Sequence, residues 1–112
     1  MVTRKTARYG DVWSVALDPI QGSEVRKTRP CVVVSPDEMN QWLPSRIVAP
    51  LTSTIKPYPS RVTIRFKGRQ GQTALDQIRT VDAVRLVRRF GVLTRDELER
   101  VSEVLVEMFR VH

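Results

Sequence analysis

The chain has 112 residues, a formal net charge of +7 and a sequence pI of about 10.5. That length suits one domain with a modest core, and a hydrophobic share of 41% with a charged share of 28% excludes a disordered chain. A compact domain this basic attracts polyanions, of which nucleic acid is the commonest. Excess cations can also serve only to keep a protein soluble, and charge alone leaves both explanations open.

Few residues are present that could hold a metal or form a disulfide. Cys31 is the one cysteine and His112, the last residue, is the one histidine, which argues against disulfides, zinc sites and a histidine base. No GxGxxG or GxxxxGKS/T phosphate loop occurs. The apolar stretches fall far short of the roughly 18 residues of a membrane span, and Met1–Tyr9 has no apolar signal region. We therefore expect a cytoplasmic protein that uses no metal and no cofactor.

The elements predicted for the first half of the chain are mostly short strands. Residues 1–9 are expected to form a loose basic arm, and residues 10–112 a single domain. Asp11–Leu17 is a predicted strand with Trp13 packed inside, while Asp18–Arg29 lacks an apolar period and indicates an exposed loop. The apolar, β-branched run Pro30–Ser35 predicts a buried strand.

The remaining strands are predicted from alternation and from turn residues. After a turn-rich connection with room for one helical turn, strands are expected over Arg46–Ser53 and over Arg61–Phe66, which alternates apolar and polar residues. A loop over residues 54–60 separates these two strands. A turn over Lys67–Gly71, one or two strands within Thr73–Val81 and a last strand over Leu86–Val92 complete the set.

The C-terminal segment carries the strongest helix signal. Thr94 followed by Glu97 makes a capping box. One face then collects apolar residues at helical spacing for core or interface packing, namely Leu98, Val101, Leu105, Met108 and Phe109. Many short strands followed by one helix favour a small antiparallel sheet or barrel closed at one end by the helix.

The loop segment Glu24–Arg29 (EVRKTR) combines one carboxylate, three cations and a hydroxyl. Such a set can bind a phosphodiester, and the planar guanidinium of arginine donates two hydrogen bonds to phosphate oxygens. On composition alone, a solvated surface loop is the simpler explanation.

Sequence blocks from Gly10 to the C-terminal helix change that weighting. They are GDVW (10–13), DP (18–19), GSE (22–24), KTRP (27–30), VVVSP (32–36), VAPLTS (48–53) and DQIRTVD (76–82). Each block is weak alone, but in this order and spacing they resemble the MazF/PemK family of mRNA interferase toxins from type II toxin–antitoxin systems. The resemblance implies an SH3-like β-barrel with a C-terminal helix. It also implies cleavage of single-stranded RNA at short base sequences, a homodimer, and an antitoxin partner, which should be acidic where this chain is basic.

Three catalytic residues follow from the resemblance. Arg29 matches the arginine of the Arg-Pro motif and would stabilise charge on the scissile phosphate. Its pKa is too high for a base, and its structural alternative is an ion pair at a strand start. Thr52 matches the catalytic Thr or Ser, with turn capping as the alternative. Glu24 matches the acidic residue and serves either as general base or as a structural partner of Arg26 or Arg29.

Further residues are candidates for contacts with RNA. These are Gln21, Ser23, Arg26, Lys27, Thr28, Ser53, Tyr58, Gln77 and Arg79, with Tyr58 expected to stack on a base. Trp42 lies in a polar connection and its role stays open. Asp76 and Asp82 are expected to be structural, and Cys31, which stands where an aliphatic residue is usual in the family, to be a small core residue.

The implied reaction uses the 2′-OH of the RNA itself, which attacks the adjacent phosphorus and gives a 2′,3′-cyclic phosphate and a 5′-OH end without a metal. Two other functions stay open. One is a toxin that poisons gyrase, as the related CcdB toxins do, against which the Arg-Pro and Pro-Leu-Thr-Ser blocks argue. The other is a non-catalytic module that binds nucleic acid or antitoxin.

Overall fold

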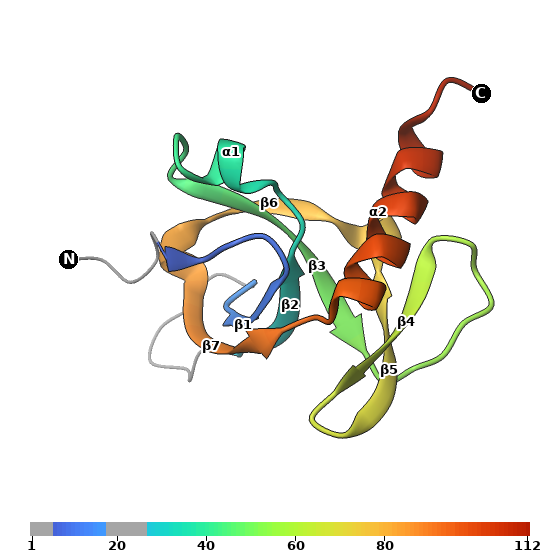
Figure 1. The fold of residues 1–112 in the computed structure, drawn as a ribbon. Coiled ribbons are helices and arrows are strands. Elements are labelled where there is room, and N and C mark those ends of the chain that lie inside the picture. Colours follow the sequence, from blue (N-terminus) through green and yellow to red (C-terminus); the bar gives the residue numbers. More distant parts are fainter. Residues whose placement is uncertain (1–5, 18–26) are drawn as a thin grey trace.

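A computed structural model of the chain describes residues 6–17 and 27–112. Within these residues the elements follow one another along the chain (Figure 1). They are β1 (Asp11–Val15), β2 (Arg29–Val33), α1 (Asp37–Asn40), β3 (Ser45–Thr52), β4 (Arg61–Phe66), β5 (Arg69–Ala74), the 3-10 turn η2 (Leu75–Gln77), β6 (Arg79–Asp82), the 3-10 turn η3 (Ala83–Arg85), β7 (Leu86–Val92) and α2 (Arg95–Phe109). Strands dominate, as the sequence predicts.

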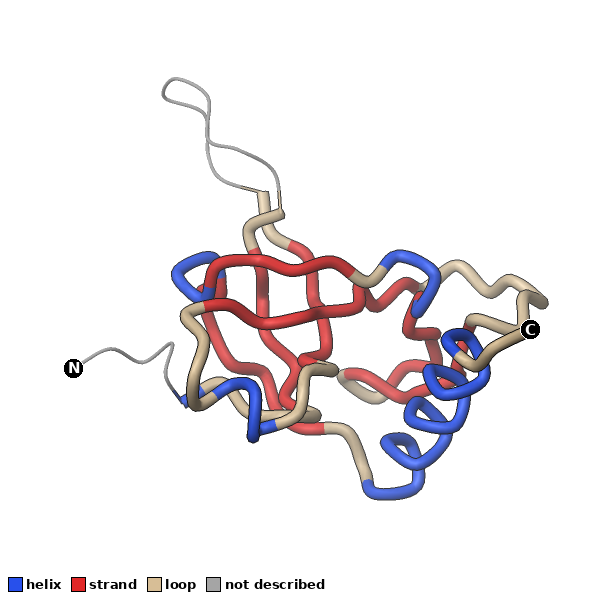
Figure 2. The backbone as a smooth tube through the Cα atoms, turned by 90° about the horizontal axis from the view of Figure 1, so that it is seen from above, coloured by secondary structure: helices blue, strands red, loops and turns tan. Residues whose placement is uncertain are grey.

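The strands form one antiparallel sheet that curls on itself. Its hydrogen-bonded order is β4-β5-β3-β2-β1-β7, and β6 pairs with β3 beside this path. Figures 1 and 2 show the curl of the strands, with α2 at one side of the curled sheet. The predicted mainly β fold, a small curled antiparallel sheet with a C-terminal helix, is confirmed.

Strand β3 lies at the centre of this arrangement because one of its edges serves two partners. Ser45–Val48 pairs with β6, whereas Leu51 and Thr52 pair with β5. Pro50 stands where the partner changes, and proline is tolerated there because its nitrogen has no hydrogen to donate to a ladder. The other edge of β3 is continuous with β2. The ends of β2 and β3 are therefore held in a fixed register.

Alternate residues of the central strands pack on opposite faces of the sheet, into two separate apolar clusters. One cluster includes Val32 and Ala49 and is covered by α2, through Val101 and its neighbours. The other includes Cys31 and Trp13 and is covered by Ala7 and Val81 among others. Because both faces of β2 are covered from Cys31 onward, the sequence Cys31–Val34 is apolar without a break. The predictions that Trp13 and Cys31 are buried are confirmed.

Helix α2 begins with the predicted capping box and also covers the outer edge of β4. The Thr94 hydroxyl accepts from the Glu97 backbone N–H, and Glu97 Oε1 accepts from the Thr94 N–H. Glu97 Oε2 also accepts the Arg65 N–H of β4 at 2.9 Å, and Arg100 donates to the Thr63 carbonyl. Side chains of α2 thus satisfy backbone groups that an edge strand would otherwise present to another chain.

Some boundaries differ from the predictions. Ala7 is buried and its carbonyl accepts from Arg46 Nε at 3.0 Å, so the prediction of a loose arm is wrong for residues 6–9. Residues 1–5 lie outside the described residues. The predicted turn over residues 67–71 is too long, because Arg69 already pairs with Phe66.

Two further differences concern the C-terminal half. The region Thr73–Val81 is interrupted by η2, which carries the chain from β5 to β6 along the same edge of β3. Phe109 is 69% exposed and lies outside the core, unlike Val101 on the predicted apolar face. No helix in the described part of the chain has the length and apolar character needed to cross a membrane.

Candidate active site

The two principal catalytic candidates, Arg29 and Thr52, lie at the ends of neighbouring strands. The β2–β3 ladder ends at the pair Cys31–Pro50, and Arg29 and Thr52 each lie two residues beyond that pair on their own strand. Both residues line the same cavity. The pairing of β2 with β3 thus brings together a guanidinium and a hydroxyl that are 23 positions apart in the chain.

A cavity of about 500 Å³ opens at this point of the fold. Its described lining is Arg29, Pro30, Leu51, Thr52, Ser53, Ile64, Phe66, Lys67, Arg69, Gln70 and Gly71. Pockets that bind small ligands typically measure about 300–1,000 Å³. Three cations and no carboxylate stand among these residues, so the described walls favour an anionic ligand.

The cations that line the cavity have no acidic partner in the described part of the chain. Arg29, Lys67 and Arg69 are exposed and make no ion pair with any described residue. The structural alternative for Arg29, an ion pair at the strand start, thus finds no partner in residues 6–17 or 27–112. The structural role considered for Thr52 is present, since its hydroxyl accepts the Thr54 N–H at 3.1 Å. A hydroxyl that accepts one hydrogen bond can still donate its own proton to a phosphate oxygen.

Gly71 sets how closely β5 approaches the end of β3 at Thr52. A Cβ atom at position 71 would lie 2.7 Å from the Thr52 carbonyl oxygen. Real side chains do not tolerate that distance against backbone, so only glycine allows β5 to pack here without displacing Thr52.

Electrostatics link Arg29 to Arg79 through the buried thiol of Cys31. Burial raises the pKa of Cys31 to about 12, against the opposing influence first of Arg29 and then of Arg79. Both guanidinium groups therefore lie near enough to the same thiol to act on it, although Arg79 does not line the cavity. With its pKa so high, Cys31 stays protonated at neutral pH and is a packing residue rather than a nucleophile.

Other predicted RNA contacts are placed around the cavity rather than in it. Ser53 lines the cavity, whereas Lys27, Thr28 and Gln77 are exposed and lie outside its lining. Tyr58 is half-exposed, and the Arg61 guanidinium lies 5.1 Å from its ring centre, so one contact of that ring is already made within the protein. Gln21, Ser23, Glu24 and Arg26 lie outside the described residues, and their predicted roles stay predictions.

Asp76 and Asp82 have the structural roles expected of them. Asp76 binds Arg61 Nε at 2.8 Å and the Ser60 hydroxyl at 2.8 Å. The hydrogen bond from Arg61 is the main cause that lowers the pKa of Asp76 to about 2. Asp82 accepts the Val84 N–H at the start of η3.

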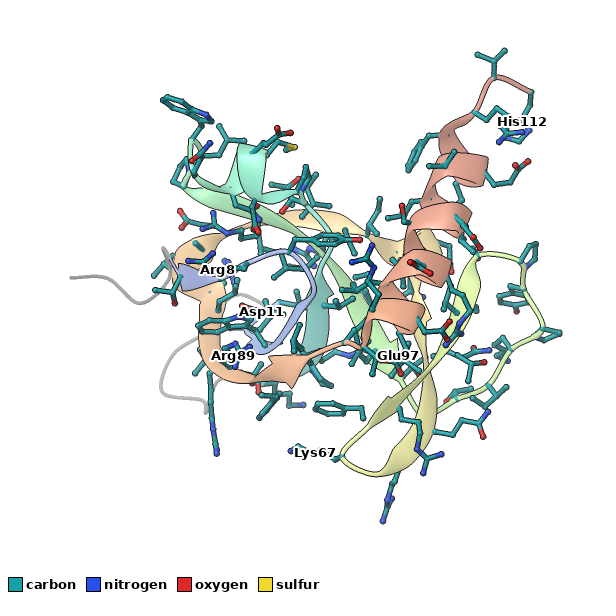
Figure 3. The ribbon with its side chains drawn as sticks, viewed as in Figure 1. Arg8, Asp11, Lys67, Arg89, Glu97 and His112 are labelled. Atoms are coloured by element: carbon teal, nitrogen blue, oxygen red, sulfur yellow. The ribbon has the colours of Figure 1, made fainter. Side chains whose placement is uncertain are left out.

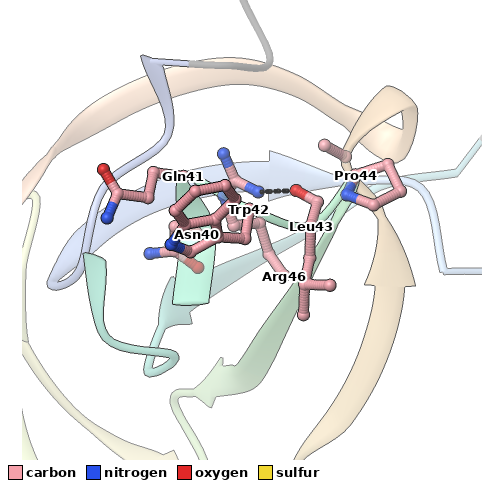
Figure 4. A pocket seen from close by; sticks show the side chains of 7 residues that line it. Asn40, Gln41, Trp42, Leu43, Pro44 and Arg46 are labelled. Atoms are coloured by element: carbon pink, nitrogen blue, oxygen red, sulfur yellow. Dashed lines mark hydrogen bonds between the residues drawn. The ribbon is translucent and has the colours of Figure 1, made fainter. Parts of the chain in front are cut away.

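Trp42 belongs to a second cavity of about 470 Å³ beside α1, away from Arg29 and Thr52. Figure 4 shows it lined by Trp42, Leu43 and Pro44, with Arg46 donating to the Leu43 carbonyl. Burial lowers the pKa of Arg46. Trp42 is 80% exposed, so it is no core residue, and it does not line the cavity that holds Arg29 and Thr52.

Sequence reasoning missed Lys67, Arg69 and Gln70, which line the same cavity as Arg29. Their signal was present, since the alternating strand of residues 61–66 followed by Lys-Gly predicts a hairpin that returns antiparallel. In the described residues, no three histidine, cysteine, aspartate or glutamate side chains gather as metal ligands would.

Comparison with known proteins identifies the family to which this fold belongs. Residues 8–109 match the model of the PemK-like, MazF-like toxins of type II toxin–antitoxin systems. The chain belongs to this toxin family. The predicted family membership is thereby confirmed.

Solved structures of related toxins share the whole fold. MazF from Deinococcus radiodurans is 26% identical, with a TM-score of 0.74 over 93% of this chain and 96% of that one. A MazE–MazF complex from the same organism matches at 25% identity and a TM-score of 0.77, over 94% of this chain and 97% of that one. A mycobacterial endoribonuclease in complex with its cognate antitoxin has 20% identity and a TM-score of 0.77, covering 94% and 96% of the two chains. The curled antiparallel sheet with its C-terminal helix is thus the fold of MazF-like toxins.

Proposed function

We propose that this PemK-like, MazF-like toxin is a sequence-specific endoribonuclease of single-stranded RNA. The observation that carries the proposal is the cavity that Arg29 and Thr52 share at the ends of β2 and β3, with cations and without carboxylates in its described lining. A phosphodiester is the anion that such a pair fits, because the guanidinium donates two hydrogen bonds to its oxygens and the hydroxyl donates a third. Endoribonuclease is also the stated activity of a mycobacterial protein with this fold.

In the proposed reaction the 2′ oxygen of the RNA attacks the adjacent phosphorus. The 2′-O–P bond forms as the bond from phosphorus to the 5′ oxygen breaks, which leaves a 2′,3′-cyclic phosphate and a 5′-OH end. The 2′-OH proton passes to a base, for which Glu24 is the candidate, and the leaving 5′ oxygen gains a proton. Arg29 and Thr52 hold the phosphate and stabilise the charge that grows on its oxygens. No metal enters this scheme.

Incubation of the chain with a long single-stranded RNA in EDTA tests the proposal. We expect cleavage at a recurrent short sequence, with 5′-OH ends and cyclic phosphates, and no cleavage of DNA of the same sequence. Arg29→Ala should lower the rate about 100- to 1,000-fold, as the loss of one charge-stabilising donor does. Intact RNA combined with gyrase inhibition would favour the CcdB-like alternative, and tight RNA binding without cleavage would favour a non-catalytic module.

We further propose an acidic antitoxin and a homodimer as partners. A net charge of +7 favours an acidic segment that lies over the cations of the cavity and blocks RNA. For the dimer, the end of α2 presents Val106, Phe109 and Val111 at 57%, 69% and 94% exposure. Concentration-dependent sedimentation tests the dimer, and Phe109→Ser should weaken it if this surface takes part.

A further inference from the structure

The hairpin of β4 and β5 brings two cations and one aromatic ring to the cavity. Phe66, Lys67, Arg69 and Gln70 of this hairpin line the same cavity as Arg29 and Thr52. A single phosphate would occupy only a small part of about 500 Å³. Space and chemistry therefore remain for a neighbouring nucleotide.

The turn of the hairpin fixes the position of Lys67. Phe66 pairs with Arg69, so the loop has two residues, Lys67 and Gly68, and both have positive φ, 54° and 75°. Two positive φ values match the type I′ turn that follows the twist of the strands. A side chain with a Cβ is uncommon in that conformation and costs about 1 kcal/mol or more. Glycine at position 67 would adopt this turn more readily, so the lysine side chain comes at a cost in stability.

Lys67 lies at the tip of the hairpin (Figure 3), over two phenylalanine rings from different strands. Its ammonium is 4.4 Å from the ring centre of Phe90 in β7 and 5.4 Å from that of Phe66 in β4. The two rings are 5.5 Å apart and tilted by 58°, and both are half-buried. Arg88 lies 5.8 Å from the Phe90 ring on another side. Aromatic rings partly open to solvent are thus flanked by cations.

These cations have no carboxylate partner among the described residues. Neither Lys67, Arg69 nor Arg88 makes an ion pair there. Rings on which bases stack, set among cations that contact phosphates, are the combination by which proteins bind single-stranded nucleic acid. A purely structural ring cluster would gain nothing from cations that lack an acidic partner in residues 6–17 and 27–112.

We propose that the β4–β5 hairpin, together with Phe90, is a binding subsite for a nucleotide that flanks the scissile phosphate. Its base stacks on the exposed part of the Phe66–Phe90 pair, and its phosphate contacts Lys67 and Arg69. This proposal rests on the proposed function, since it takes the RNA strand from Arg29 and Thr52 toward the hairpin. It assigns binding, and not bond cleavage, to these residues.

Binding of an uncleavable strand separates the two proposals. A single-stranded DNA of mixed base sequence, long enough to reach from Arg29 to the hairpin, is titrated by fluorescence anisotropy at several salt concentrations. We expect Lys67→Gly to weaken binding about tenfold and to lower the slope of log K against log salt by about 0.7, the loss of one phosphate contact. Lys67→Arg keeps the charge and should retain most of the affinity. Arg110→Ala, which removes a cation at the far end of α2, is the matched control.

Cleavage of two RNA lengths gives the second arm. Lys67→Gly should reduce the advantage in kcat/KM of a long RNA over one truncated to the cleavage sequence. Weakened binding without any cleavage by the unaltered chain would support the subsite and overturn the proposed function. Cleavage with binding, salt slope and length preference equal in Lys67→Gly and Arg110→Ala would overturn the subsite alone. Because Lys67→Gly relieves a positive φ, loss of folding does not confuse the result.

Discussion

The arginines of helix α2 and the cations around the cavity differ in their partners. On α2, Arg95 and Arg100 each bind a carboxylate one turn away, at 3.2 and 3.3 Å, and Arg110 binds Glu107 at 3.6 Å. Around the cavity, Arg29 and Lys67 have no such partner in the described residues. Exposed ion pairs stabilise a fold little, by about 0.3–0.5 kcal/mol within a helix. Their presence on α2 neutralises that surface, whereas the cavity keeps its positive field for a ligand.

The polar side chains of the two regions also differ in the hydrogen bonds that they accept. Glu97 at the start of α2 accepts hydrogen bonds from two backbone N–H groups and so holds the helix to β4. Thr52 beside the cavity accepts one local hydrogen bond and keeps its proton available. We therefore expect changes on the α2 side to reduce stability, and changes at the cavity to reduce activity.

The largest expected effect is that of Thr52→Val, which removes the hydroxyl and keeps the shape. RNA cleavage should fall about 100- to 1,000-fold, because one donor to the phosphate is lost. Stability should fall by only about 1 kcal/mol, the contribution of the hydrogen bond from Thr54. Single-turnover cleavage and urea unfolding measure the two effects, and Thr52→Ser should preserve both properties. Cleavage by Thr52→Val at the rate of the unaltered chain would remove Thr52 from the mechanism.

The second prediction concerns Glu97→Ala at the α2 side. The variant loses both hydrogen bonds from backbone to carboxylate, and the free energy of unfolding should fall by about 2–3 kcal/mol. Urea unfolding followed by circular dichroism measures it. Glu99→Ala is the matched control, since it removes only the exposed pair with Arg95. Equal losses in the two variants would show that α2 does not depend on its link to β4.

The smallest expected effect is the acid dependence of the Arg61–Asp76 pair. The hydrogen bond that Arg61 donates is the main cause that lowers the pKa of Asp76 from an ordinary 3.8 to about 2. The unfolded chain therefore takes up the proton first, and the stabilisation is complete above the ordinary pKa and is lost as the pH falls toward 2. The Tm difference between the unaltered chain and Asp76→Asn should be largest near neutral pH and shrink in acid. A constant difference would mean that the carboxylate charge contributes nothing.

Local signals in the sequence were sufficient for much of the fold. The helix start at Thr94 and the strands Arg61–Phe66 and Leu86–Val92 agree with the structure, because capping and alternation depend on neighbouring residues. The break at η2 could not be foreseen, since it follows from β5 and β6 sharing one edge of β3. The packing of Ala7 is likewise a long-range contact, made with Arg46.

The candidate site was predictable in part for a similar reason. Arg29 and Thr52 came from blocks of sequence, and the β2–β3 register explains why they meet. Lys67 and Arg69 carry no motif of their own, and only the return of the β4–β5 hairpin brings them to the same cavity. Net charge in a sequence favours an anionic ligand, whereas strand pairing decides which cations line one cavity.

Gly71 shows how such a toxin can be disarmed without loss of any functional group. Its missing side chain leaves 2.7 Å between the would-be Cβ and the Thr52 carbonyl oxygen, so even a methyl group there must move the strand that carries the hydroxyl. Under the proposed function, Gly71→Ala should therefore lower RNA cleavage by displacing Thr52. The variant would keep Arg29, Thr52 and every cation of the cavity, but its Thr52 hydroxyl would be out of position for the phosphate.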